Sequence, residues 1–129
     1  MAETGLASFD RTLDKTNHVL KEIERAYGWP KERRNQSYDA LRGVLHAVRD
    51  RLPVQETAQL AAQLPMLVRG IYYEGWSPTG KPAKERHREE FLKHIQQQLK
   101  GDGEINPEIL ALAVFSLLAK RITSGEIEM

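Results

Sequence analysis

The stretch Gly43-Val-Leu-His-Ala-Val-Arg-Asp-Arg-Leu-Pro-Val-Gln-Glu56 decides the fold class of this chain. Its apolar residues recur every three or four positions, which is the spacing of one face of an α-helix. We expect this helix to run from the low thirties to Leu52. Pro53 then stops it, because proline has no backbone N–H to donate. The face expected to be buried carries Tyr38, Leu41, Leu45, Val48 and Leu52, and the face expected in water carries Arg42, Arg49 and Asp50.

A later stretch repeats this pattern. Ala113-Val-Phe-Ser-Leu-Leu-Ala-Lys-Arg-Ile-Thr-Ser-Gly-Glu126 matches residues 43–56 at a constant offset, with apolar residues opposite apolar ones, and the match extends into the loop after the helix. Further upstream, Leu20-Lys-Glu-Ile23 resembles Leu92-Lys-His-Ile95. We interpret these matches as an internal duplication of a helix pair. The alternative is chance similarity between amphipathic helices.

The two copies differ in length. Repeat one covers about residues 9–76, whereas repeat two covers about 84–129 and is incomplete. Helical repeats bury their faces against their neighbours, so an incomplete copy is expected to leave apolar surface uncovered. Either the helix expected at about 66–74 and its neighbours fold back over this surface, or a second subunit covers it. We therefore expect a homo-oligomer, a dimer formed through the helix expected at about 107–122 and the tail around Ile127.

The chain is expected to form one all-α domain over residues 1–129, a bundle of about six helices. Besides the helix that ends at Leu52, we expect helices at about 9–27, 54–64, 66–74, 84–99 and 107–122. No segment shows the alternation of apolar and polar residues that is typical of a strand, so no sheet is expected.

Local signals place the ends of two of these helices. Ser8 and Asn106 are the expected N-caps of the first and last helices, and Gly28 is the expected C-cap of the first. A stripe of residues from Phe9 to Tyr27 is expected to face the core. The last helix is apolar on most of its surface, which predicts a place at the centre of the bundle or under a partner chain.

Composition excludes several classes of function. The chain has 129 residues, of which 40% are hydrophobic and 29% charged, and this balance supports a buried core. A net charge of +1 gives no basis for binding nucleic acid or an anionic membrane. Cysteine is absent, which removes thiolate catalysis and cysteine metal sites and fits a reducing compartment. No signal peptide is recognisable, and the longest apolar run, 109–115, is too short to span a bilayer, so we expect a cytoplasmic protein.

Three pieces of the chain together carry a family resemblance. They are Ala40-Leu-Arg-Gly-Val-Leu-His-Ala-Val-Arg-Asp-Arg-Leu-Pro-Val-Gln-Glu56, Ala58-Gln-Leu-Ala-Ala-Gln-Leu-Pro65 and Arg69-Gly-Ile-Tyr-Tyr-Glu-Gly-Trp76, and Arg86-His-Arg-Glu-Glu-Phe91 follows them. Over roughly Phe9 to Glu126 the chain resembles the bacterial domain-of-unknown-function family 2267. The resemblance implies a small helical protein of the bacterial cytoplasm. It carries over no catalytic residues, because no activity is established for the family.

The most distinctive segment is residues 69–76, which combines three large aromatics with a cation and a carboxylate. Aromatic side chains with a polar tip suit recognition surfaces, because they bury area and still offer a hydrogen bond. The candidate interaction surface consists of Arg69, Tyr72, Tyr73, Glu74 and Trp76, and its ligand would be a peptide or a small anion. Arg69 and Tyr73 share a helical face, which would allow a cation–π contact. The alternative is a helix end that lines the core, with Tyr72 and Trp76 buried and Glu74 capping the helix or paired with an arginine.

Three residues with metal-binding side chains, His87, Glu90 and His94, fall along one stripe of the fifth expected helix. Helical metal sites usually take carboxylates from a second helix, and the arginines on both sides of His87 would repel a cation. We therefore interpret the stripe as a solvated polar face. No nucleophile motif or phosphate-binding glycine loop is present either, so we expect no catalytic residue, no cofactor and no metal.

Two hypotheses for function remain. The first is a non-catalytic helical protein-interaction or regulatory module that works as a homo-oligomer. The second is a small-ligand or metal-binding helical bundle with an enzymatic role, which needs His87, Glu90 and His94, or Arg69 and Tyr73, to meet in one cleft. A nucleic-acid binder is not expected, because the helix expected at 54–64 has no Arg or Lys to read bases.

Overall fold

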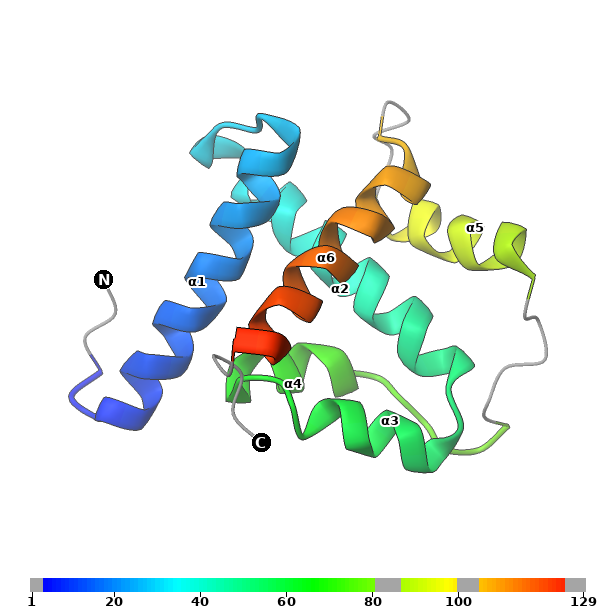
Figure 1. The fold of residues 1–129 in the computed structure, drawn as a ribbon, viewed down its shortest axis with the longest axis horizontal. Coiled ribbons are helices and arrows are strands. Elements are labelled where there is room, and N and C mark those ends of the chain that lie inside the picture. The colour runs from blue at the N-terminus through cyan, green and yellow to red at the C-terminus, as the bar shows by residue number, and fades with distance from the viewer. Residues whose placement is uncertain (1–3, 81–86, 100–104, 125–129) are drawn as a thin grey trace.

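The computed structural model describes residues 4–80, 87–99 and 105–124 of the chain. Within these residues the fold consists of six α-helices and one short 3₁₀-helix, with no strand (Figure 1). The elements are α1 (Ala7–Tyr27), η1 (Lys31–Arg33), α2 (Arg34–Arg51), α3 (Val54–Ala61), α4 (Met66–Tyr73), α5 (Arg88–Gln98) and α6 (Pro107–Ser124). The all-α fold expected from the helical periodicity is confirmed.

Helix α2 lies at the centre of the fold and contacts α1, α4, α5 and α6. Figure 1 shows α6 crossing in front of α2, with α1 and α5 on either side and with α3 and α4 below. The middle of α2 is buried on most sides because it carries small and aliphatic residues, among them Ala40, Gly43 and Ala47. Of the two places expected for α6, the centre of the bundle is occupied by α2, and a place under a partner chain stays a prediction. Helix α2 takes this place because its small residues allow neighbouring helices to approach closely.

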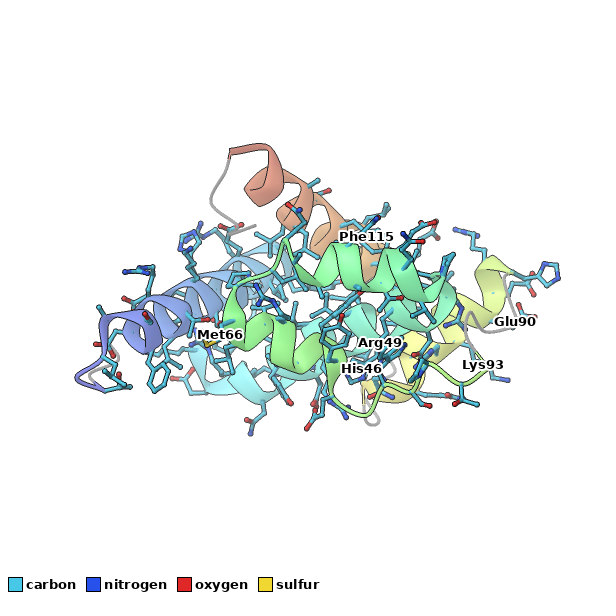
Figure 2. The ribbon with its side chains drawn as sticks, turned by 90° about the horizontal axis from the view of Figure 1, so that it is seen from below. His46, Arg49, Met66, Glu90, Lys93 and Phe115 are labelled. Carbon is cyan, nitrogen blue, oxygen red and sulfur yellow. The ribbon has the colours of Figure 1, made fainter. Side chains whose placement is uncertain are left out.

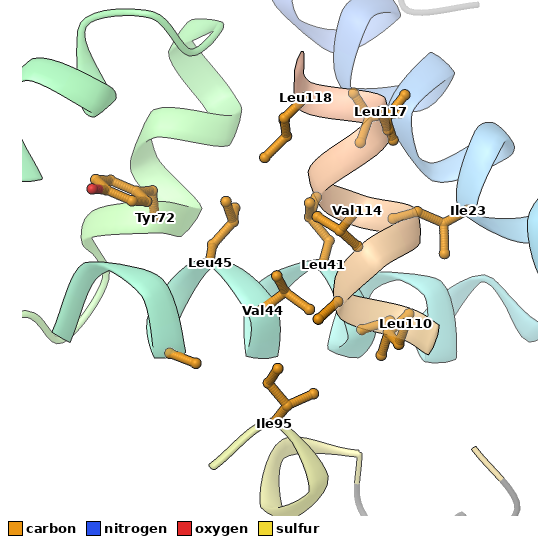
Figure 3. Close-up of a cluster of buried hydrophobic side chains, with 14 of the residues drawn as sticks. Ile23, Leu41, Val44, Leu45, Tyr72, Ile95, Leu110, Val114, Leu117 and Leu118 are labelled. Carbon is orange, nitrogen blue, oxygen red and sulfur yellow. The ribbon is translucent and has the colours of Figure 1, made fainter. Parts of the chain in front are cut away.

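The hydrophobic core forms where α1, α4, α5 and α6 meet α2. Figure 3 shows aliphatic side chains of α2 pointing toward side chains from the four surrounding helices. The fully buried members of this cluster include Ile23, Leu41, Val44, Leu45, Tyr72, Ile95, Leu110 and Val114. Burial of each such side chain contributes roughly 1.5–3 kcal/mol to folding. This core therefore fixes the positions of five helices with respect to one another.

Helix α1 begins earlier than predicted. Its first residue is Ala7 and its N-cap is Leu6, which offers no side-chain bond, so the predicted cap at Ser8 is wrong. The carboxylate of Asp10 accepts hydrogen bonds from the backbone N–H of Thr4, at 2.7 Å, and from its hydroxyl, at 2.9 Å, and so holds the chain before the helix. Phe9 is 47% exposed, because this first turn extends past the core.

The other end of α1 agrees with the sequence prediction. Gly28 adopts a left-handed conformation with φ of 67°, which a residue with a side chain rarely adopts, and its N–H bonds the carbonyl of Arg25. The Trp29 ring stacks on the Tyr27 ring with centroids 4.7 Å apart and packs against the core. At the start of α6, Asn106 caps the helix as predicted, because its side-chain oxygen accepts the N–H of Glu108 at 2.9 Å.

A buried ion pair joins α1 to α2. Arg34 donates two hydrogen bonds to the carboxylate of Glu24, at 2.8 and 3.0 Å, and Ser37 donates a third at 2.7 Å. Arg34 also bonds the side chain of Asn17. The hydrogen bond from Arg34 is the largest cause that lowers the pKa of Glu24 below its ordinary value. Periodicity did not reveal this network, because a charged residue on a helix is read as exposed unless its partners are known.

Helices α2 and α5 approach each other closely at Gly43. A Cβ atom added to Gly43 would lie 2.9 Å from Cβ of Gln98, closer than real side-chain atoms approach. Glycine at this position therefore allows the two helices to touch. The helix ends also differ from prediction: α3 ends at Ala61 rather than near residue 64, and α6 continues to Ser124. No helix in the described part of the chain has the length and apolar character needed to cross a membrane.

Candidate functional site

The predicted interaction segment, residues 69–76, forms the second half of α4 and the turn that follows it. The side chain of Arg69 does not point toward Tyr73, although their shared helical face would have allowed a cation–π contact. Its guanidinium donates hydrogen bonds to the backbone carbonyls of Ala61 and Leu64, both at 2.9 Å, at the end of α3. The last carbonyls of a helix have no partner within the helix, so Arg69 supplies the missing donors. The residue is therefore a cap that ties α4 to α3.

Tyr72 is fully buried between α4 and α2. Its hydroxyl donates a hydrogen bond to the carbonyl of Thr57 at 3.0 Å, and the Thr57 hydroxyl donates to the carbonyl of Arg49 at 3.2 Å. Burial raises the pKa of Tyr72 to about 12, so this hydroxyl keeps its proton at physiological pH. Tyr72 is thus a core residue with a satisfied polar tip, and it is not available to a ligand.

Two side chains of α2 hold the end of α4. Arg49 donates to the carbonyls of Tyr72 and Glu74, at 2.8 and 2.6 Å, and His46 donates from Nε2 to the carbonyl of Ile71 at 2.7 Å. Burial lowers the pKa of His46. Figure 2 labels both residues, which lie side by side next to α4. Arg49 was predicted to face water, and this prediction is wrong, because the unpaired carbonyls at the end of α4 draw its guanidinium inward.

The remaining residues of the segment lie at its rim. The Tyr73 ring contacts the rings of Tyr72 and Trp76, with centroids 5.4 and 5.5 Å apart, and both Tyr73 and Trp76 are half-buried. Glu74 is exposed and pairs with Arg42 of α2 at 3.2 Å. Trp76 Nε1 is buried and has no hydrogen-bond partner in the described part of the chain. Tyr72 and Glu74 thus lie as in the alternative of a core-lining helix end, whereas Trp76 is only half-buried.

The three residues of the predicted metal-binding stripe, His87, Glu90 and His94, differ in their surroundings. His87 precedes α5 and is exposed, whereas Glu90 and His94 are half-buried against α2. His94 accepts a hydrogen bond at Nδ1 from Arg51 at 3.0 Å. A shallow groove of about 360 Å³ runs along this contact and is lined by Arg51, Glu90, Lys93, His94 and Gln97. Among residues 4–80, 87–99 and 105–124, no three acidic, histidine or cysteine side chains gather as a metal would require.

Helix α6 presents large apolar side chains to solvent. Leu110, Ala111, Val114, Leu117 and Leu118 form its buried face. On the opposite side, Ile109 is 55% exposed, Leu112 58% and Phe115 38%. Ser116 and Ala119 share this side and are exposed too. We call these five residues the outer face of α6. Phe115 at its edge stacks on Phe91 of α5, with centroids 6.2 Å apart.

A second apolar surface involves no residue of α6. The first turns of α1 and α4 form a groove of about 310 Å³, lined by Thr4, Phe9, Thr12, Leu13, Met66, Leu67 and Gly70. Met66 is 53% exposed and Leu67 is 38% exposed. We call this surface the α1–α4 groove. It differs from the outer face of α6 in being concave, and it draws its residues from two helices.

Comparisons with known proteins identify the family. The model of the family described as "Uncharacterized conserved protein (DUF2267)" matches residues 16–129. The match includes every helix after the first turns of α1, and it covers both the segment 69–76 and the outer face of α6. A comparison with curated proteins finds no match. Since the family model covers most of the chain, the protein belongs to the DUF2267 family, as the resemblance of its central segments predicted.

Proposed function

We propose that the chain is a non-catalytic protein-interaction module whose binding surface is the outer face of α6. The observation that carries the proposal is the exposure of Ile109, Leu112 and Phe115, three large apolar side chains on successive turns of one helix. Apolar patches of this kind on a folded domain mark binding surfaces for other proteins. The opposite side of α6 is packed into the core, so the exposed residues are held in a fixed arrangement that a partner can recognise.

The module is proposed to act as a homo-oligomer, most simply a dimer, in the bacterial cytoplasm. The absence of cysteine supports a reducing compartment, and the family resemblance supports a bacterial setting. The segment 69–76 is not the main contact in this proposal. Arg69 and Tyr72 use their polar groups inside the fold, which leaves Tyr73, Glu74 and Trp76 as a secondary surface at most.

Native mass spectrometry of the untagged chain, purified from its own host, tests the proposal. We expect the wild type to retain a protein partner, either a second copy or another chain. Leu112→Asp introduces a charge on the outer face and should release the partner, leaving a bare monomer. Leu67→Asp is the matched control, because it places the same charge at an exposed leucine of the α1–α4 groove. Loss of the partner in the control alone would move the binding surface to that groove, and a bare wild-type monomer would contradict the proposal.

One observation favours the second candidate function, that of a small-ligand-binding bundle with an enzymatic role. In the groove between α2 and α5, Nε of Arg51 and Oε2 of Glu90 are both buried, and neither has a hydrogen-bond partner in the described part of the chain. Buried polar groups are normally paired, so a ligand or an ordered water would satisfy them. The same mass spectra discriminate, because a retained small molecule or metal that Arg51→Met releases would support this candidate.

A further inference from the structure

We infer that the partner covering the outer face of α6 is a second copy of this chain, and that the two α6 helices pack antiparallel across a two-fold axis. This inference rests on the proposed function, since it takes the outer face as the binding surface. To the homo-oligomer proposed above it adds the direction of the helices and the register between them. Three independent features of the described residues lead to it.

The first feature is the size order of side chains along the outer face. Ile109, Leu112, Ser116 and Ala119 follow one another at spacings of three, four and three residues, so they form one continuous stripe on the helix. The half near the start of the helix carries two large side chains, and the half near its end carries two small ones. All four residues are exposed. The stripe is thus a ridge that continues into a shallow depression.

An antiparallel pair of such stripes is complementary to itself. With the axis near residue 114, Ile109 lies opposite Ala119 of the partner copy, and Leu112 lies opposite Ser116 of the partner copy. Each large residue then meets a small one, and the same contact forms twice, as a two-fold interface requires. A parallel pair would set large against large and small against small. The small half would then keep an unfilled gap, which forfeits packing energy.

The second feature is a depression beside the small half of the stripe. Between α1 and α6 lies an apolar groove of about 300 Å³, lined by Glu22, Ile23, Ala26, Ala113, Ser116 and Leu117. Ser116 belongs both to this groove and to the outer face. In the antiparallel register, Leu112 of the partner copy lies over Ser116 and can enter the groove. A protruding leucine therefore meets a hole of matching apolar character.

The third feature comes from comparing α6 with α2, its counterpart in the proposed duplication. At the constant offset of the sequence match, Val44 corresponds to Val114, and both are fully buried. Ile23 and Ile95, which correspond in the two preceding helices, are fully buried as well. These agreements support the duplication. They also allow the surroundings of the two helices to be compared position by position.

The comparison shows which side of α6 lacks a cover. Leu45, His46 and Arg49 are buried on α2, and the last two bond carbonyls at the end of α4. Their counterparts on α6 are Phe115, Ser116 and Ala119, which are all exposed. The side of α2 that another helix covers is thus the side of α6 that stays exposed, apart from the contact of Phe115 with Phe91. Ser116 and Ala119 cannot cap a helix end as His46 and Arg49 do, so this side suits a helix lying alongside it.

Disulfide trapping tests the inference, because the wild-type chain has no cysteine. Full-length Ile109→Cys and Ala119→Cys proteins are mixed and oxidised mildly, and the cross-linked products are identified by intact mass. In the antiparallel register, position 109 of one copy and position 119 of the other lie at the same height along the helix axes. Two copies of position 109 are instead about 15 Å apart along the axis, from a rise of 1.5 Å per residue. Val54→Cys replaces Ile109→Cys in the control mixture, since Val54 is an exposed apolar residue on α3.

We expect the 109–119 product to form at least about tenfold faster than the 54–119 product. A 109–109 product as the main species would indicate a parallel pair and would overturn the inference. A 109–119 product that forms at the same rate as the 54–119 product would also overturn the inference. If cross-linking fails while Leu112→Asp still releases a different protein from the wild type, the outer face remains the proposed binding surface, and the proposed homo-oligomer and this inference are both wrong. All three positions are exposed, so folding is expected to persist, and circular dichroism of each variant verifies this.

Discussion

Nη1 of Arg49 lies 2.8 Å from the carbonyl oxygen of Tyr72, and this bond ties the last turn of the central helix to the end of α4. The same nitrogen bonds the carbonyl of Glu74 at 2.6 Å. Because the bond to the Tyr72 carbonyl is buried, no water can replace the guanidinium there. Arg49 thus links the two most distinctive sequence segments of the chain, residues 43–56 and residues 69–76.

Arg49→Met should lower the free energy of unfolding by about 2–3 kcal/mol, the range for hydrogen bonds to a charged group whose loss leaves buried acceptors unpaired. Methionine keeps much of the aliphatic packing, so the effect isolates the bonds. Urea unfolding followed by circular dichroism measures it. Arg11→Met on the exposed side of α1 is the control, and an equal effect of the two substitutions would refute the capping role of Arg49.

Two glycines in helices should respond in opposite directions to alanine. Gly43→Ala should destabilise the fold by roughly 1–3 kcal/mol, because its new Cβ would lie 2.9 Å from Gln98 and would push α5 away from α2. Gly70→Ala meets no atom within 4 Å and should stabilise α4 by about 0.5–1 kcal/mol. Thermal unfolding of the two variants in parallel measures both effects. A stabilising Gly43→Ala would show that α2 and α5 are not in close contact.

The buried hydroxyl of Tyr72 gives a spectroscopic prediction. Its pKa is raised to about 12 by burial, so its ionisation should fall at the alkaline end of an ultraviolet absorbance titration. Tyr72→Phe should remove that part of the absorbance change. It should also lower stability by about 1 kcal/mol, because the hydrogen bond to the Thr57 carbonyl is lost. If Tyr73→Phe removes the same part of the titration instead, the assignment to Tyr72 is incorrect.

Histidine 46 should make stability depend on pH near neutrality. Burial holds its pKa in the folded protein below the ordinary value of 6.5. The unfolded chain therefore takes up the proton first as the pH falls, and stability decreases below about pH 6.5 until the folded protein also binds it. His46→Gln can still donate to the carbonyl of Ile71 but does not titrate. Its free energy of unfolding, measured between pH 8 and pH 5, should fall less steeply than that of the wild type, and identical slopes would contradict the prediction.

Hydrophobic periodicity predicted the number of helices and most of their positions, because the spacing of apolar residues is set by which face meets the core. Local residue signals predicted the caps at Gly28 and Asn106, where backbone geometry selects the residue type. Periodicity was wrong for Arg49, and it gave no sign that Glu24 is buried. Their partners are a backbone carbonyl on α4 and an arginine ten positions away, and neither partner is visible as a period along the chain.

The candidate site was predictable only in part. The sequence marked residues 69–76 because of their unusual chemistry, but the side chains of Arg69 and Tyr72 serve the fold. The apolar character of α6 indicated either a central helix or a covered one. Only the packing shows that Ile109, Leu112 and Phe115 lie on the side away from the core. Which side of an almost wholly apolar helix stays exposed depends on its neighbours, so no pattern within the helix could settle it.

Sedimentation equilibrium of the purified chain, over a range of concentrations, tests most directly whether the outer face of α6 joins two copies. The wild type should approach twice its chain mass of 14.7 kDa as concentration rises. Leu112→Asp should weaken that association by about a hundredfold or more, because a two-fold interface carries the change twice. Leu67→Asp should associate as the wild type does. A wild type that stays at the monomer mass at every concentration, or a Leu112→Asp protein that associates equally well, would contradict the account.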